Sequence, residues 1–190
     1  MSDTAVPRSL LEKVAGRLRQ PASFSQGGAG SILAIAGAQY GAHLSDEDLT
    51  QPTGFDPHAA ALFEAVVESA FLVASADGEF DDTERAAFEH VVLSACSGSV
   101  SQAQLRALLA DLSDLRDEDG ADKRVQMVAR TISRAEQARE VLRVAALIAQ
   151  VSQGVSDVER RILDRLASEF HLDAGAVDGA LAEAERVLAE

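Results

Sequence analysis

Residues 68–84 have the sequence ESAFLVASADGEFDDTE, and this stretch decides the fold. Its first nine residues are apolar on nearly every side of a helix, which predicts a helix buried at the centre of the protein. Asp77-Gly78 then interrupts the helical pattern. Asp81 and Glu84 stand three residues apart, the spacing of a capping box that starts a new helix. The stretch therefore predicts a central helix, a tight acidic turn and a second, amphipathic helix.

Helical periodicity extends along the whole chain, and period-two runs of β-branched residues do not appear. Asp56-Pro57 has the form of an N-cap followed by proline at the first helical position. The spacing of a capping box recurs at Ser9 with Glu12, Ser101 with Gln104, Ser133 with Glu136, and Ser156 with Glu159. A charged turn is expected over residues 116–123. We predict an all-α fold, a compact bundle of about eight or nine helices.

The arrangement around the acidic turn occurs twice in the chain. A shift of 75 residues places Glu84 on Glu159, and five apolar residues then coincide at helical spacing. The apolar stretch VAALIAQV, residues 144–151, matches the first central stretch, and Gln153-Gly154 matches Asp77-Gly78. We therefore expect two related helical hairpins around two central apolar helices, within one domain.

Composition excludes several classes of protein. Seventeen Lys and Arg residues against 31 Asp and Glu residues give a net charge of −14, which opposes broad electrostatic binding to nucleic acid or anionic membrane. The single cysteine, Cys96, excludes an internal disulfide framework. The first twenty residues contain no secretory signal, and the most lipid-like window, residues 31–42, is about half the ~20 residues that span a bilayer. We expect a cytoplasmic protein without a membrane span.

The turn from Asp77 to Glu84 holds five carboxylates in eight residues. Ca²⁺ and Mg²⁺ prefer oxygen ligands gathered in this way, which predicts a divalent-cation site formed by Asp77, Glu79, Asp81 and Glu84. An EF-hand is excluded, because its glycine follows three acidic positions, whereas here the glycine is the second residue. The alternative interpretation is structural: Gly78 ends one helix, and the acids stabilise the N-terminus of the next.

These residues resemble a known family. The string FLVASADGEFDDTERAAFEHVV, residues 71–92, resembles the first motif of the TerB-like (tellurite resistance) proteins. Residues 142–172 resemble the second motif, although Gln153 and Val155 stand where the family usually has Asp and Glu. The same module occurs at the start of certain DnaJ-like membrane co-chaperones. The resemblance predicts a TerB-like all-α domain over residues 56–190. Residues 1–55 match neither motif, and we expect them to form a partly apolar N-terminal extension of helix and loop.

The resemblance implies a non-enzymatic module for stress response and protein–protein interaction. Its motif residues here are Asp77, Glu79 and Glu84, and it implies binding of a divalent cation and recruitment of protein partners into membrane-associated assemblies. It does not imply that this protein reduces tellurite. Reduction of an oxyanion needs a source of electrons, and a single cysteine without a visible cofactor motif is a poor source.

Two other functions stay open from the sequence. The first is an enzyme with carboxylate-bound Mg²⁺ that acts on a phosphorylated substrate. Inward-facing acids such as Glu64 and Glu68 would be its sign, although the matched second helix has no acid between Val141 and Val151. The second is a part of a co-chaperone system, although the chain lacks the His-Pro-Asp tripeptide of a J-domain.

Overall fold

The computed structural model describes residues 6–21, 31–42, 56–78, 80–151 and 154–189. These residues form nine α-helices and no strand, which confirms the predicted all-α fold. The helices are α1 (Arg8–Arg19), α2 (Ile32–Ala42), α3 (Pro57–Ala74), α4 (Asp82–Ala95), α5 (Gln102–Asp119), α6 (Ala121–Thr131), α7 (Ala135–Ala149), α8 (Asp157–Glu169) and α9 (Ala176–Ala189).

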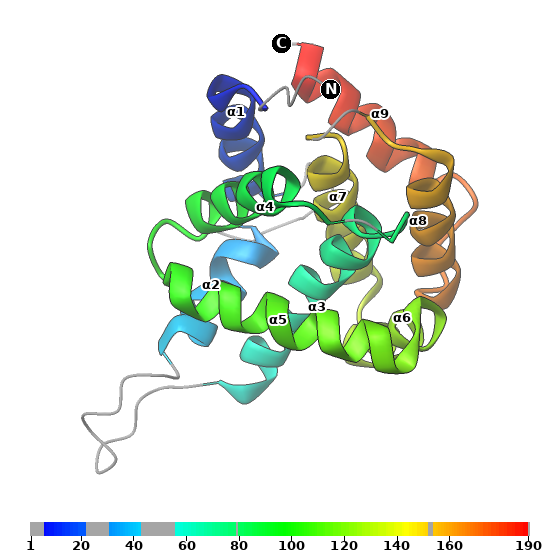
Figure 1. The fold of residues 1–190 in the computed structure, drawn as a ribbon. Coiled ribbons are helices and arrows are strands. Elements are labelled where there is room, and N and C mark those ends of the chain that lie inside the picture. Colours follow the sequence, from blue (N-terminus) through cyan, green and yellow to red (C-terminus); the bar gives the residue numbers. More distant parts are fainter. Residues whose placement is uncertain (1–5, 22–30, 43–55, 79, 152–153, 190) are drawn as a thin grey trace.

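Helices α3 and α7 pack against each other at the centre, and the other helices surround them (Figure 1). Val73 of α3 and Leu147 of α7 are both 0% exposed. Each of the two helices is buried on nearly all sides, α3 against α2, α6 and α8, and α7 against α8 and α9. The two apolar stretches of the sequence thus form the core, as predicted.

The local features of the internal repeat are present in both copies. Gly78 and Gly154 adopt positive φ angles of 92° and 87°, which lie in the left-handed region that favours glycine. Capping boxes form at the start of α4, with Asp81 and Glu84, and at the start of α8, with Ser156 and Glu159. The α3–α4 and α7–α8 hairpins therefore share a glycine in the left-handed conformation after the first helix and a capping box at the start of the second helix.

Three local predictions were wrong. Helix α1 begins two residues earlier than expected, after Pro7, and no side chain caps it, so Ser9 and Glu12 do not form a capping box. Helix α7 follows Arg134, again without a side-chain cap, because Glu136 is its second residue rather than its third. The expected charged turn over residues 116–123 is helical except for Gly120, at which α5 passes directly into α6.

The described helices of the N-terminal extension pack into the same core. Leu18 of α1 and Leu33 of α2 are both fully buried within it. Gly41 lets α2 approach the turn after α4 closely, because a Cβ atom there would overlap the carbonyl oxygen of Ser99. A Cβ atom at Gly37 would lie 2.9 Å from Sγ of Cys96. Both glycines therefore serve close packing within a globular core.

One described helix, α3, is long and apolar enough to cross a membrane, with 67% of that stretch buried inside the protein. The core helix of a globular domain has the same length and composition, so this feature alone is weak support for a membrane span. Its burial against α2 and α7 agrees with its position at the centre of the bundle.

Candidate metal-binding turn

The acidic turn joins the end of α3 to the start of α4. Asp77 follows the last turn of α3, and Gly78 reverses the chain with its positive φ. Oδ1 of Asp81 accepts a hydrogen bond from the backbone of Glu84 at 2.8 Å, and Oε2 of Glu84 accepts one from the backbone of Asp81 at 3.3 Å. The capping box uses these two oxygens and holds both carboxylates at the N-terminus of α4. Glu79, the fourth predicted ligand, lies outside the described residues.

The matching turn of the second hairpin brings a further carboxylate. Oε2 of Glu159 accepts a hydrogen bond from the backbone of Ser156 at 2.7 Å, in the same role as Glu84. Glu159 is 8% exposed. The charge of Glu159 acts on Glu84, so the two capping-box glutamates of the repeat lie close enough to interact.

The carboxyl group of Glu84 has a raised pKa. Burial is the largest cause, and a hydrogen bond from the backbone of Asp81 opposes it. The negative charges of Asp81, Asp77 and Glu159 raise the pKa further. Carboxylates of both hairpins thus contribute to the negative potential at Glu84. Arg116 lies beside the end of α3 and donates its hydrogen bonds to the carbonyl oxygen of Ser75 and to Asp117.

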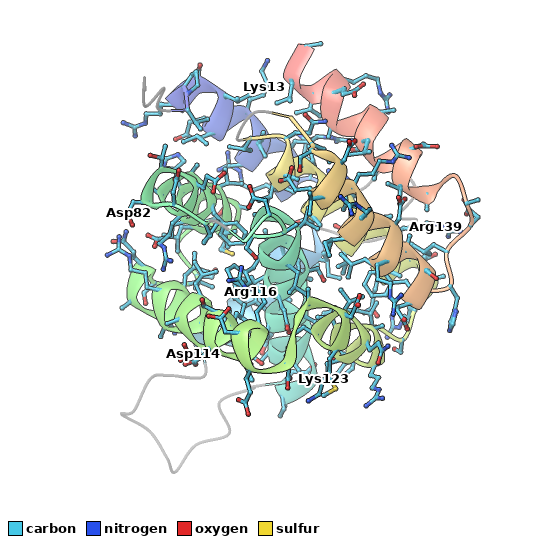
Figure 2. All side chains as sticks on the ribbon, turned by 45° about the vertical axis from the view of Figure 1, so that its right-hand side comes forward. Lys13, Asp82, Asp114, Arg116, Lys123 and Arg139 are labelled. Atoms are coloured by element: carbon cyan, nitrogen blue, oxygen red, sulfur yellow. The ribbon has the colours of Figure 1, made fainter. Side chains whose placement is uncertain are left out.

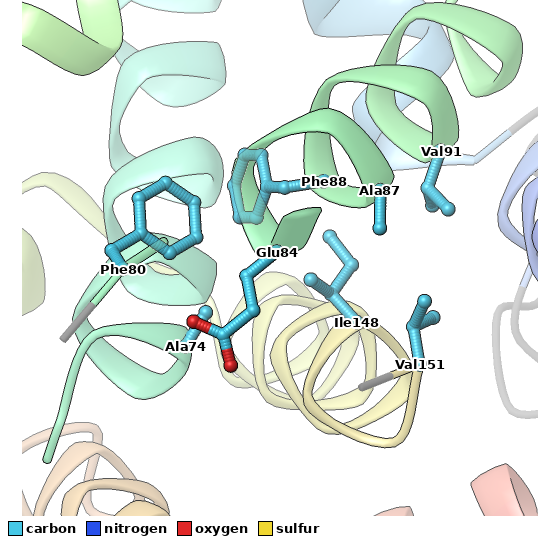
Figure 3. Close-up of a pocket in the computed structure, with 8 residues that line it drawn as sticks. All are labelled: Ala74, Phe80, Glu84, Ala87, Phe88, Val91, Ile148 and Val151. Atoms are coloured by element: carbon cyan, nitrogen blue, oxygen red, sulfur yellow. The ribbon is translucent and has the colours of Figure 1, made fainter. Parts of the chain in front are cut away.

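A small pocket opens beside Glu84, between α4 and the end of α7 (Figure 3). Its volume of about 20 Å³ holds roughly one water-sized group. Apart from Glu84, its walls are apolar side chains, among them Phe80, Phe88 and Ile148. The pocket therefore offers one carboxylate and is too apolar to enclose a cation, which takes six or more oxygen ligands if it is Ca²⁺. A cation held here would lie at the surface among the acids of the turns.

Among the residues that the structure describes, no three His, Cys, Asp or Glu side chains are close enough together to hold a metal ion. The predicted set includes Glu79, so the complete set of four carboxylates is not described together. The cation site remains a prediction.

The chain was compared with known proteins. The family model described as "Tellurite resistance protein TerB" matches residues 63–186, more than half of the chain. The chain belongs to the TerB family. The matched region of this TerB protein begins within α3 and ends within α9, so it contains both turns, whereas α1 and α2 lie outside it. Neither the comparison with curated proteins nor the comparison with solved structures found a match.

Other buried acids of this TerB protein have structural partners. Glu68 of α3 is held by Arg124 of α6, with N–O distances of 2.6 and 3.0 Å. Glu64 lies on the exposed side of α3. An enzyme of the kind considered above would require both glutamates to face inward. Glu68 is instead paired with an arginine, and Glu64 is directed to the surface.

The sequence missed two features of this TerB protein. The first is the proximity of Glu159 to Glu84, for which the 75-residue shift was the available signal, since it equated the two residues. The second is Arg143, which is 1% exposed in the middle of α7. An arginine within an otherwise apolar helix could have indicated a buried ion pair, because charged residues are rarely buried unless they are paired.

Proposed function

We propose that this TerB-family protein is a non-enzymatic interaction module of the stress response, in which a divalent cation, Ca²⁺ or Mg²⁺, binds at the acidic turns. One observation carries the proposal: the charges of Asp77, Asp81 and Glu159 all act on Glu84. A divalent cation would offset this repulsion, which disfavours the charged form of Glu84 when no cation is bound. Glu159 is an additional ligand in this proposal, supplied by the second hairpin.

A bound cation would tie the two hairpins together. Asp77, Asp81 and Glu84 belong to the first hairpin, and Glu159 belongs to the second. A cation shared among these four carboxylates would reduce the negative charge where the two hairpins meet. It would also restrict the movement of one hairpin relative to the other. The proposed protein partner recognises this cation-bound surface, in the cytoplasm and within a membrane-associated assembly.

Support for a non-enzymatic role comes from the engagement of the buried carboxylates. Glu89 is bound by Arg106, Glu140 accepts a hydrogen bond from the backbone of Ile32 at 2.9 Å, and Glu183 is bound by Arg143. Together with the Glu68–Arg124 pair, these contacts give the buried acids a role in holding helices together. A general base must be able to reach a substrate, and these side chains are committed elsewhere.

Replacement of Glu84 by Gln tests the cation site without removing the helix cap. Gln104 occupies the equivalent position in the capping box of α5, so glutamine supports this geometry in the same chain. At 100 times its dissociation constant, a cation should stabilise the parent protein by about 2.7 kcal/mol. We expect Glu84→Gln and Glu159→Gln each to remove most of this gain, as measured by thermal unfolding in Ca²⁺, Mg²⁺ or a chelator.

Glu185→Gln is the matched control, because it removes one charge from an exposed position on α9, a helix that supplies none of the proposed ligands. It should keep the full gain in stability from the cation. If no cation shifts the melting temperature of the parent, or if Glu185→Gln loses the gain as Glu84→Gln does, the proposed site is wrong.

The raised pKa of Glu84 predicts a pH dependence in the metal-free protein. A carboxyl group whose folded-state pKa lies above its ordinary value of 4.5 destabilises the fold as the pH rises through the raised value. Glu84→Gln has no such charge, so its stability relative to the parent should increase between pH 4 and pH 7. The difference should stay below about 1 kcal/mol, because Glu84 is only partly buried and solvent screens its charge. Thermal unfolding in chelator measures the stability of both proteins. A difference in stability between Glu84→Gln and the parent that does not vary with pH would contradict the proposed repulsion.

A further inference from the structure

A second charged feature lies between α1 and α9, far in the sequence from the acidic turns. An open cleft of about 740 Å³ separates the two helices, within the range of roughly 300–1,000 Å³ typical of small-molecule sites. Its charged lining consists of Lys13, Arg17, Arg19, Arg186, Glu12 and Glu183. Cations thus outnumber acids two to one here, whereas acids outnumber cations 31 to 17 in the whole chain.

The two carboxylates of the cleft already have basic partners within the protein. Oε1 of Glu12 lies 3.1 Å from Nε2 of His90 on α4 and 4.0 Å from Nε of Arg8. Oε1 of Glu183 accepts hydrogen bonds from Nη2 of Arg17 at 2.6 Å and from Nε of Arg143 at 2.9 Å. Burial raises the pKa of Glu183, but the hydrogen bonds and charges of these two arginines lower it below its ordinary value, so the group is ionised at neutral pH.

Arg143 places additional positive charge behind the cleft. It is 1% exposed, and its Nη2 donates to the carbonyl oxygen of Arg17 at 3.0 Å. Its Nη1 is buried and has no hydrogen-bond partner among the described residues. Glu183 therefore faces two guanidinium groups with a single negative charge. Within this group of three side chains, positive charge exceeds negative charge by one.

The remaining cations of the cleft are available to a ligand. Lys13, Arg19 and Arg186 form no ion pair with any described residue, and Arg186 donates only to the carbonyl oxygen of Ala182 in its own helix. Lys13 lies on the side of α1 that faces α9 (Figure 2). Cations in the last turn of a helix also stabilise its dipole, which accounts for Arg19 and Arg186. That effect does not account for Lys13, which lies well before the last turn of α1.

We propose that the cleft between α1 and α9 binds the phosphate groups of a small polyphosphate compound. Arginine and lysine side chains bind phosphate through charge-assisted hydrogen bonds. The ligand is small because the charge of −14 on the whole chain repels long polyanions. The described lining contains no aromatic side chain on which a nucleobase could stack, so the phosphates carry the recognition.

This site is independent of the proposed cation site and of the family match. Helix α1 lies outside residues 63–186, so the family region alone supplies only the α9 side of the cleft. Gly16 of α1 lines the cleft and leaves it open, because a Cβ atom there would meet only Nη2 of Arg19, at 3.8 Å.

Isothermal titration calorimetry of the full chain with inorganic triphosphate, in chelator and low salt, tests the proposal. Lys13→Gln and Arg186→Gln should each weaken binding by about tenfold, the loss expected for one charge-assisted hydrogen bond. Gly16→Leu should weaken it by filling the cleft without a change of charge. Arg130→Gln, at an exposed position of α6, is the control for net charge and should bind like the parent.

Two sources of phosphate are distinguished by further titrations. ATP should bind as tightly as triphosphate, because the base has no partner in the cleft. Binding to vesicles that contain phosphatidylinositol phosphate, lost in Lys13→Gln, would assign the phosphates to a lipid headgroup, and binding of the soluble compounds alone would assign them to a free metabolite. The proposal is overturned if triphosphate and vesicles both fail to bind, or if Arg130→Gln weakens binding as much as Lys13→Gln.

Discussion

Leu147→Asp should leave the protein unfolded or nearly so. Leu147 lies in α7 at the contact with α3 and is 0% exposed, so the new carboxylate would be buried without a partner. The cost of several kcal/mol is comparable with the entire stability of a domain of this size, about 5–15 kcal/mol. Val73→Asp, at an equally buried position of α3, should have the same effect. Circular dichroism and denaturant unfolding measure both variants.

Met127→Asp provides the control for these variants. Met127 is 40% exposed on α6, so an aspartate there remains in contact with water. We expect it to change the free energy of unfolding by less than about 1 kcal/mol, mainly through helix propensity. A parent-like melting temperature of Leu147→Asp or Val73→Asp would show that the corresponding helix is not central.

Gly41→Ala should have the second-largest effect, although it adds a single methyl group. The new Cβ atom would overlap the carbonyl oxygen of Ser99, which belongs to the backbone of the turn after α4 and has no rotamer by which to move aside. Overpacking of this kind typically costs about 1–3 kcal/mol. We expect the free energy of unfolding to fall by that amount, or α2 to separate from the turn.

The same substitution at Gly179 separates packing from helix propensity. Gly179 lies inside α9, and a Cβ atom there would meet no atom within 4 Å. Gly179→Ala should therefore stabilise the protein by up to about 1 kcal/mol, since alanine favours the helix. Denaturant unfolding of both variants measures the two effects, and similar values for Gly41→Ala and Gly179→Ala would contradict the close approach of α2.

The two charged regions of the protein follow different rules. At the acidic turns, the charges of Asp77, Asp81 and Glu159 act on Glu84, and the proposed ligand is a small cation. In the cleft between α1 and α9, long cationic side chains line an open space, which favours an extended anion. The titrations described above test the two regions separately, because Glu84→Gln and Lys13→Gln alter one region each.

The sequence by itself determined the parts of the fold that depend on neighbouring residues. The apolar stretches predicted α3 and α7, since a helix that is apolar on all sides is stable only when buried. Asp56, Asp81 and Ser156 predicted helix starts, because each cap is closed by a backbone group two or three residues further along the chain. The two wrong capping boxes, at Ser9 and Ser133, show that the spacing alone does not determine where a helix begins.

Only the tertiary structure decided which distant side chains meet. The approach of Glu159 to Glu84, the Glu68–Arg124 pair and the burial of Arg143 against Glu183 all join helices that are separate in sequence. Ion pairing and desolvation depend on distances between whole helices, and those distances follow from how α3 and α7 pack. For that reason the four predicted ligands of the first turn were visible in the sequence, whereas the contribution of Glu159 from the second turn and the cleft between α1 and α9 were not.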